Sequence, residues 1–324
     1  MPGNFNTHCV PTYRLLTDEQ IKAFHRATLD ILETVGVRVL HTQALSMLRD
    51  AGCRIIKDDT VQIPNALVEE CIQSAPSGIT LFDRQGNEAM HLEGNQVHFG
   101  LGTDLLQTYD LETSELRLSC LKDVADAAVV ADYFDEIDFI ASHAFPNEVP
   151  GNLAFIAEFK ALIENSVKPI YFTSAGAEDL QFILKMAAAV SGSADRLRQK
   201  PFLIHYAEPV SPLVHSRGAV NKLLLCADRG IPLNYVPALM AGGTGPVTMA
   251  GSIAVANAEA LSGLVIHQLR AQGAPMISGF SVTPLDMRTG NTVYGSPEER
   301  LTHTACTQLY HFYGIPVWGE AGRS

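Results

Sequence analysis

The sequence lacks the closely spaced cysteine pairs on which structural zinc sites and disulfide scaffolds depend. A chain of 324 residues, of which 47% are hydrophobic, has enough apolar material to build a core without such cross-links. Its six cysteines lie far apart: Cys9, Cys53, Cys71, Cys120, Cys226 and Cys306. This pattern predicts reduced thiols in a cytoplasmic protein.

Runs of basic residues and a signal peptide are also missing. Lys and Arg number 23 against 35 Asp and Glu, and the formal net charge is -12; we therefore expect no nucleic-acid partner. The N-terminus has no basic flank followed by an apolar segment. The most apolar stretch, residues 247–269, contains Asn257, Glu259 and His267, which favours a buried helix over a membrane span.

The first part of the chain, residues 1–135, alternates short segments of different type. Thr17-Asp18-Glu19-Gln20 is a capping box that begins a helix, and Gly36 ends it. Short strand candidates separated by turns follow, among them 79–82 and 97–99. We predict an N-terminal α+β extension that covers the rest of the protein or serves as an oligomerisation arm of a homo-oligomer.

Residues 136–324 follow a regular alternation of strands and helices. The strand candidates are residues 137–142, 170–173, 202–207, 233–236, 276–279 and 317–319. The helical patterns between them are residues 153–165, 178–190, 217–229, 248–271 and 297–313. Such alternation predicts parallel strands joined by helical crossovers.

Two architectures accept this alternation, an open doubly wound sheet and a closed barrel. A nucleotide-binding doubly wound sheet carries G-x-G-x-x-G after its first strand, and none follows residues 137–142. We therefore predict an α/β fold of the TIM-type (β/α) barrel. Because such a barrel has eight strands and six are visible, we expect it to be C-terminally incomplete; the alternative is that residues 79–82 and 97–99 supply the other two.

Aromatic and acidic residues follow the predicted strands, where the active site of a barrel lies. Rings and carboxylates together suit an alkylammonium cation. The predicted substrate-binding residues are Phe172, His205, Tyr206, Tyr235, Phe280 and Trp318. Glu208 and Glu320 are the predicted catalytic residues, as acid, base or charge partner of the cation. The alternative for each ring is packing of the barrel rim.

A glycine-rich loop and the histidines are further candidates. Gly242, Gly243 and Gly245 precede a helix, so their N–H groups suit an anionic group of a cofactor; a tight turn is the equal alternative. His303 and His311 are too far apart on one helix to chelate one ion, and the other histidines lack a visible third ligand. We predict no metal site.

Several motifs together resemble the trimethylamine methyltransferase family. They are Gly242-Gly243-Thr244-Gly245-Pro246-Val247-Thr248, Asn257-Ala258-Glu259, Asp286-Met287-Arg288-Thr289-Gly290, Gly295-Ser296-Pro297-Glu298 and Tyr313-Gly314-Ile315-Pro316. Their order and spacing extend the resemblance over nearly the whole chain. The resemblance implies a TIM-barrel enzyme of methylamine metabolism and methanogenesis, which transfers a methyl group from an N-methylated amine to the cobalt of a separate corrinoid protein.

The family divides into trimethylamine enzymes that contain pyrrolysine and enzymes without it that act on quaternary amines such as glycine betaine. Its members continue past the region of residues 321–324, so we expect the codon after Ser324 to be UAG, which favours trimethylamine; a gene fragment is the alternative. A lyase or aldolase would need a lysine at a strand end, whereas Lys168 and Lys200 precede strands. A non-catalytic remnant that binds amines is the third reading.

Overall fold

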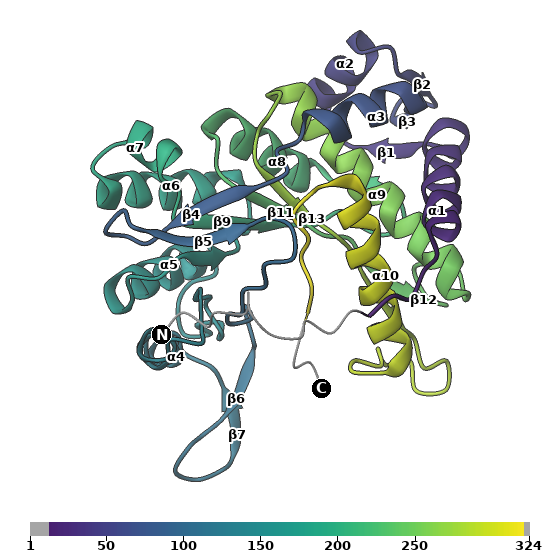
Figure 1. Ribbon diagram of the computed structural model, residues 1–324. Coiled ribbons are helices and arrows are strands. Elements are labelled where there is room, and N and C mark those ends of the chain that lie inside the picture. Colours follow the sequence, from purple (N-terminus) through teal and green to yellow (C-terminus); the bar gives the residue numbers. More distant parts are fainter. Residues whose placement is uncertain (1–12, 321–324) are drawn as a thin grey trace.

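A parallel four-stranded sheet organises the protein, which is described here by a computed structural model over residues 13–320 (Figure 1). Its strands are β8 (Ile170–Phe172), β9 (Leu203–Ala207), β11 (Leu233–Tyr235) and β13 (Met276–Ser278), in the order β13-β11-β9-β8. Cys9 and the region 321–324 lie outside the described residues. The other five cysteines are free thiols in the described residues.

Two isolated parallel bridges lengthen this sheet at its edges. Ile140 pairs with Ile170 beside β8, and Val317 pairs with Ser278 beside β13. All six segments predicted as strands therefore lie side by side in their predicted order. The sheet does not close within residues 13–320, so the fold is mixed α/β and barrel closure stays a prediction.

The two alternative strand candidates behave differently from each other. Residues 79–82 form β4 (Ile79–Phe82), which pairs with β5 (Glu88–Leu92) in an antiparallel hairpin and with no other strand of residues 13–320. Residues 97–99 form no strand, but the next residue, Gly100, makes a parallel bridge to Phe139. The hairpin contributes Ile79, Leu81 and Met90 to a small hydrophobic cluster on one face of the parallel sheet.

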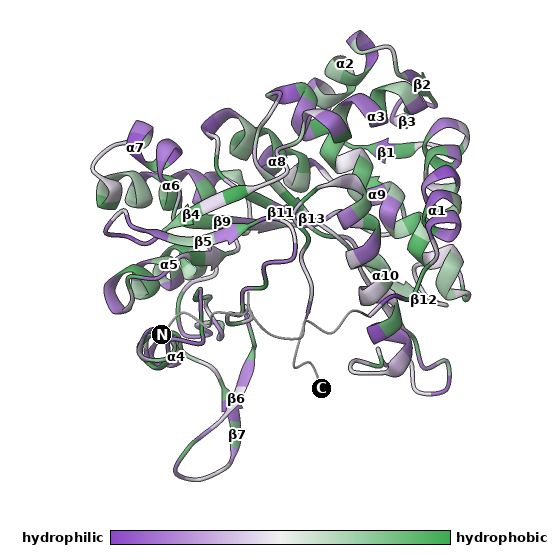
Figure 2. Ribbon diagram, viewed as in Figure 1, coloured by the Kyte–Doolittle hydropathy of each residue, from purple (hydrophilic) through white to green (hydrophobic). Residues whose placement is uncertain are grey.

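The predicted helices join the strands and cover the other face. They are α5 (Ala154–Asn165), α6 (Ala177–Ser191), α8 (Arg217–Arg229), α9 (Met249–Arg270) and α10 (Pro297–Tyr313). In Figure 2 hydrophilic residues gather on outward turns, as in α1 (Asp18–Asp30), α2 (Thr42–Asp50) and α7 (Ala194–Gln199). The bounds agree with the predicted ones within a residue or two because Gly230, Gly314 and Pro297 mark them locally.

Two helices were not predicted. One is α7, a single short piece that begins at the N-cap Ser193. The other is α4 (Leu121–Tyr133), whose N-cap is Cys120 and whose Asp123 side chain accepts from the Cys120 N–H at 2.8 Å. Cysteine is not among the usual N-cap residues, so the start of α4 had no recognisable signal.

The N-terminal elements form a second, smaller sheet with one strand from the later half of the chain. The capping box is confirmed, since Thr17 and Gln20 exchange side chain–backbone hydrogen bonds at the start of α1. The π-helix η1 (Ile31–Val35) follows, and Gly36 has a φ of 79°. The sheet order is β10-β1-β3-β2, from β10 (Val214–His215), β1 (Val37–Val39), β3 (Thr60–Gln62) and β2 (Arg54–Ile56). The division at residue 135 stays a prediction.

Helix α9 is the central helix of the fold. It packs against α1, α2, α8, α10 and α3 (Asn65–Ser74). By length and composition it could cross a membrane, but 78% of its most apolar window is buried inside the protein. Several of its buried polar groups have protein partners: Asn257 Nδ2 donates to Thr28 and Tyr313, and Ser262 contacts His215. These features are typical of a core helix, as the sequence predicted.

Two further pairs of strands lie outside these sheets. Strands β12 (Ala238–Ala241) and β14 (Ser281–Pro284) form a parallel pair just beyond the ends of β11 and β13. Strands β6 (Gln107–Tyr109) and β7 (Leu116–Leu118) form a hairpin that projects from the body of the molecule in Figure 1. The predicted substrate-binding and catalytic residues lie near the C-terminal ends of the parallel strands or in the segments that follow them.

Candidate active site

Neighbouring residues on a strand point to opposite faces of the sheet, and this alternation divides the predicted site residues into two groups. On β9, His205 is fully buried and packs on Phe172, with ring centroids 4.8 Å apart. The next residue, Tyr206, is half-buried and faces Tyr171 on the other side, at 5.9 Å. We call the side of Tyr171 and Tyr206 the inner face and the side covered by helices the outer face.

Four of the six predicted substrate-binding residues lie on the outer face. Phe172 packs on Phe159 of α5 at 5.4 Å, and His205 packs on Phe172. Tyr235 and Phe280 are likewise buried, against α9 and α10 respectively. The structure does not bring these four together with Tyr206 and Trp318. The surroundings of these four residues match the alternative reading, in which each ring serves in packing. A strand residue can face the pocket or the helices but not both.

The inner face carries a cluster of aromatic rings. The indole of Trp318 stacks on Tyr171, with centroids 4.4 Å apart and an interplanar angle of 7°. Phe139 lies 5.9 Å from Trp318 and 6.1 Å from Tyr171. Tyr171, only 3% exposed, was not predicted as a site residue. Because successive side chains of a strand point to opposite faces, a Phe172 that faces the helices implies a Tyr171 that faces the other way.

Both catalytic candidates lie close to these rings. The Tyr206 hydroxyl donates to Glu208 Oε2 at 2.5 Å. Burial, the largest cause, and the negative charges of Glu320 and Glu208 raise the pKa of the Tyr171 phenol well above its ordinary value. Burial and the same two carboxylates also raise the pKa of Tyr206. The rings therefore stay neutral at physiological pH, and negative charge gathers around them.

Asp104 also lies near Tyr171, and it was not predicted as a site residue. Its two carboxylate oxygens accept from Ser142 Oγ and Thr173 Oγ1, each at 2.9 Å. Its charge also raises the pKa of Tyr171. Asp104 has a φ of 61°, a left-handed conformation that non-glycine residues rarely adopt. The polar turn after residues 97–99 was a local signal, but its place beside the first parallel strand depends on tertiary structure.

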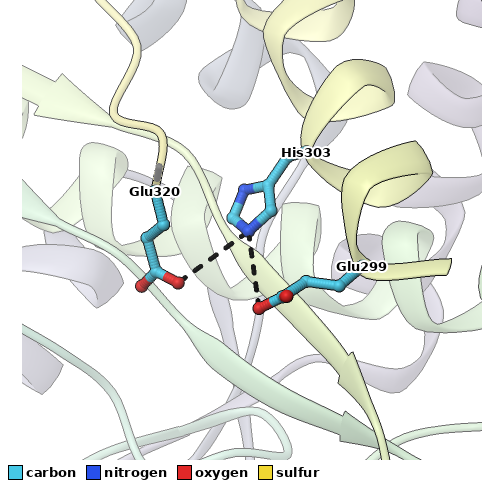
Figure 3. Close-up of side chains that lie close together, drawn as sticks. All are labelled: Glu299, His303 and Glu320. Atoms are coloured by element: carbon cyan, nitrogen blue, oxygen red, sulfur yellow. Dashed lines mark ion pairs between the residues drawn. The ribbon is translucent and has the colours of Figure 1, made fainter. Parts of the chain in front are cut away.

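Glu299, His303 and Glu320 form a second polar cluster (Figure 3). His303 Nε2 lies 3.9 Å from Glu299 Oε1 and 3.8 Å from Glu320 Oε2. Glu299 is fully buried and accepts from the N–H of Gly295 at 2.5 Å. One ligand atom from each of the three residues lies within 4.8 Å of the others, so they are the described residues that could hold a divalent cation.

No metal site was predicted from the sequence, in which His303 was considered only together with His311 and found too distant from it to share an ion. The spacing of Glu299 and His303, four residues apart on one helix, was the available signal, because such residues share a helix face. Glu320 comes from the segment after Val317 and joins them only through the fold. This cluster shares Glu320 with the surroundings of Tyr171.

The glycine loop forms a closed turn. The N–H of Gly242 donates to the carbonyl oxygens of Gly245 and Pro246, and those of Gly243 and Gly245 donate to Met240 O. Gly242 has a φ of 88°. The N–H groups of all three predicted cofactor-binding glycines are thus engaged inside the loop. These features match the alternative reading of the loop as a tight turn. A hydrogen-bonded N–H group is not available to bind an anion.

Comparison with known sequences gives a consistent result. The profile of the family described as trimethylamine methyltransferase matches residues 3–324. A trimethylamine methyltransferase of Desulfitobacterium hafniense is 32% identical over 310 residues, which cover 94% of this chain and 62% of the relative. One from Methanosarcina barkeri is 32% identical and covers 94% and 63%. A glycine betaine methyltransferase of Desulfitobacterium hafniense is 29% identical and covers 97% and 65%.

Solved structures show a similar fold. The monomethylamine methyltransferase of Methanosarcina barkeri superposes with a TM-score of 0.59 at 12% identity, over 94% of this chain and 61% of that structure. A hydroxylamine complex of the monomethylamine enzyme gives a TM-score of 0.61. This chain therefore spans a little over three fifths of the length of the relatives it matches.

Proposed function

Because this chain belongs to the trimethylamine methyltransferase family, we propose that it binds an N-methylated amine and transfers one of its methyl groups to the Co(I) of a separate corrinoid protein. The observation that carries the proposal is the stack of Trp318 on Tyr171 with carboxylates around it. Aromatic faces attract alkylammonium cations by about 0.5–2 kcal/mol each, and carboxylates supply the opposite charge.

We assign the binding of the substrate to four residues: Tyr206, Trp318, Glu208 and Glu320. The two rings hold the methyl groups of the cation, and the two carboxylates balance its charge. Tyr206 holds Glu208 in place through its hydroxyl hydrogen bond. Because Tyr171 is already stacked and accepts from Asn234 Nδ2 at 2.9 Å, it forms a rigid floor under the substrate.

The protein contributes positioning and charge to this reaction. The corrinoid, when its carrier protein docks, supplies the nucleophilic cobalt. Tyr206 and Trp318 orient the amine so that one methyl carbon points out of the pocket, toward the docking partner. Glu208 is exposed and therefore lies on the side from which such a partner approaches.

The acidic surroundings favour a simple alkylamine such as trimethylamine. The charged groups that act on the Tyr171 phenol are the carboxylates of Glu320, Asp104 and Glu208. A betaine carries its own carboxylate, which these groups would repel. The 29% identical glycine betaine methyltransferase nevertheless makes quaternary amines the second candidate. A cytoplasmic location and a homo-oligomeric state stay predictions.

The test is a methyl-transfer assay with the purified protein, a Co(I) corrinoid protein and a panel of tri- and tetra-alkylated amines. We expect the cobalt spectrum to change from Co(I) to the methylated form with trimethylamine. A parallel calorimetric titration measures binding of the same amines without the corrinoid. Binding without any methyl transfer would support the non-catalytic alternative, and the absence of both would overturn the proposal.

A further inference from the structure

The cluster of Glu299, His303 and Glu320 brings two carboxylates and one imidazole together (Figure 3). These are ligand types that a divalent transition-metal ion takes from proteins. His303 Nε2 lies 3.9 Å from Glu299 Oε1 and 3.8 Å from Glu320 Oε2. The exposed fractions of the three side chains, in chain order, are 0%, 12% and 23%. The cluster is therefore a partly enclosed set of ligand atoms and not a solvated group of surface acids.

The two oxygens of the buried Glu299 carboxylate face different neighbours. Oε2 accepts from the N–H of Gly295 at 2.5 Å and lies 3.7 Å from Arg300 Nη2. Within residues 13–320, Oε1 receives one long hydrogen bond, of 3.4 Å from Thr283 Oγ1, and it faces His303. Buried charges in proteins are paired or coordinate metal ions, and Oε1 is the oxygen that points into the cluster.

Arg300 supports both acidic residues from outside the cluster. Its Nη2 atom lies beside Glu299 Oε2, and its Nη1 atom donates to the backbone carbonyl of Glu320 at 2.8 Å. Neither contact uses the carboxylate oxygens nearest to His303. Contacts of this kind orient the ligands of a metal ion without competing for it.

The separations within the cluster suit Zn²⁺ after small movements of the side chains. Bonds of about 2.0–2.2 Å in a tetrahedron place neighbouring ligand atoms about 3.3–3.6 Å apart. The two separations from His303 Nε2 exceed this range by a few tenths of an ångström. The ligand atoms of Glu299 and Glu320 lie within 4.8 Å of each other, a separation that rotation of the half-buried Glu320 side chain would shorten.

We propose that Glu299, His303 and Glu320 bind a divalent transition-metal ion, and that this ion opposes binding of the alkylammonium substrate. The second part rests on the proposed function, in which Glu320, two residues after Trp318, balances the charge of the substrate. With a neutral imidazole, the two carboxylates and Arg300 carry one net negative charge. A bound divalent ion changes it to one net positive charge, which repels an ammonium ion.

The first test is a calorimetric titration of the metal-free protein with Zn²⁺ at pH 7, without any amine. We expect one strong site per chain. His303→Ala should weaken Zn²⁺ binding about 100-fold or more, because loss of a supporting partner alone costs about 10- to 100-fold. His311→Ala removes an exposed histidine further along α10 and, as the matched control, should keep the wild-type affinity. Equal affinities of wild-type protein and His303→Ala would overturn the site.

Glu299→Gln provides a second variant, which keeps the size of the side chain and an acceptor for the Gly295 N–H. It should weaken Zn²⁺ binding about 10-fold or more, since the charge of the ligand is lost. Thermal unfolding with and without Zn²⁺ separates loss of the site from loss of the fold, because an ion that binds the folded state raises its stability. A folded Glu299→Gln protein that Zn²⁺ stabilises as much as wild type would show that Glu299 is not a ligand, contrary to the proposal.

The second test measures the affinity for tetramethylammonium with and without saturating Zn²⁺. We expect Zn²⁺ to weaken it about 5-fold or more, and saturating tetramethylammonium to weaken Zn²⁺ binding by the same factor. In His303→Ala, Zn²⁺ should have no such effect. An amine affinity that Zn²⁺ leaves unchanged in wild type would contradict the opposition between the two cations. Absence of tetramethylammonium binding even without Zn²⁺ would count against the proposed function, whereas the metal site, measured without amine, would stand.

Discussion

The indole ring of Trp318 lies flat on the phenol ring of Tyr171, with centroids 4.4 Å apart and 7° between the ring planes. Backbone pairing fixes this arrangement, since the Trp318 N–H donates to Ser278 O of β13 at 2.9 Å. Tyr171 belongs to β8, at the other edge of the four-stranded sheet. The stack therefore spans the inner face and connects two strands that are not hydrogen-bonded neighbours, which requires the sheet to be strongly curved.

Trp318 is the only tryptophan of the protein, so its fluorescence reports directly on this site. We expect tetramethylammonium to change the intensity or wavelength of the emission in a saturable manner. Trp318→Leu should weaken binding of the same cation, measured by calorimetry, by about 2- to 30-fold, because one cation–π contact is lost. Emission that is unaffected by saturating cation would place the binding site elsewhere.

Glu208→Gln should lower the affinity for an alkylammonium cation and leave a neutral ligand of the same shape unaffected. The reason is that Glu208 contributes charge near the rings, while its amide analogue can still accept the Tyr206 hydroxyl. We expect a decrease of about 2- to 5-fold for this exposed carboxylate. Glu112→Gln, a charge removal on the β6–β7 hairpin, is the control and should have no effect. If Glu208→Gln and Glu112→Gln lowered the affinity for the cation equally, Glu208 would act only through the overall negative charge of the protein and not as part of the binding site.

Gly263→Ala should destabilise the protein because helix α9 has no room for a methyl group at this position. A Cβ atom there would lie 2.3 Å from Tyr235 Cε1, and Tyr235 is held by a 2.7 Å hydrogen bond between its hydroxyl and His215 Nδ1. Overpacking of this kind costs about 1–3 kcal/mol, measurable by urea unfolding. Gly151→Ala, where nothing lies within 4 Å of the new atom, is the control. An unchanged unfolding midpoint for Gly263→Ala would contradict this packing.

Glu259→Gln should flatten the dependence of stability on pH between about 4.5 and 7. Burial raises the pKa of Glu259 to about 7 in the folded protein, against hydrogen bonds from Ser211 and Leu213 that lower it. The folded state thus binds more protons than the unfolded state in this window, so the stability that Glu259 contributes at low pH is lost as the pH rises through 7. The loss amounts to at most about 3 kcal/mol.

The measurement for this prediction is urea unfolding at several pH values for both proteins. The raised pKa of Glu158 acts in the same direction up to about pH 9, but it is present in both proteins and cancels in their difference. A wild-type and a variant curve with the same slope between pH 4.5 and 7 would show that Glu259 is ionised throughout.

Local signals in the sequence determined the elements and their order. Helix ends could be recognised without tertiary structure because their signals act within one turn of helix. These signals are the capping box at Thr17, the glycines that end α8 and α10, and Pro297 at the start of α10. The apolar strand segments and the helices between them imply a parallel arrangement by the handedness of crossovers. The aromatic and acidic character of the site was also visible in the sequence, because Tyr206, Glu208, Trp318 and Glu320 lie at or just after the C-terminal ends of predicted strands.

Only the tertiary structure decided which of these residues face each other. Side chains along a strand alternate between its two faces with a known period, but which residues face inward depends on the face that the helices cover. In the folded protein Tyr235 and Phe280 pack against helices, whereas Tyr171 stacks with Trp318. Asp104 reaches Glu158, and Glu320 reaches His303, across long stretches of chain. Such contacts arise from the packing of whole elements, whose burial outweighs any preference of the residues themselves.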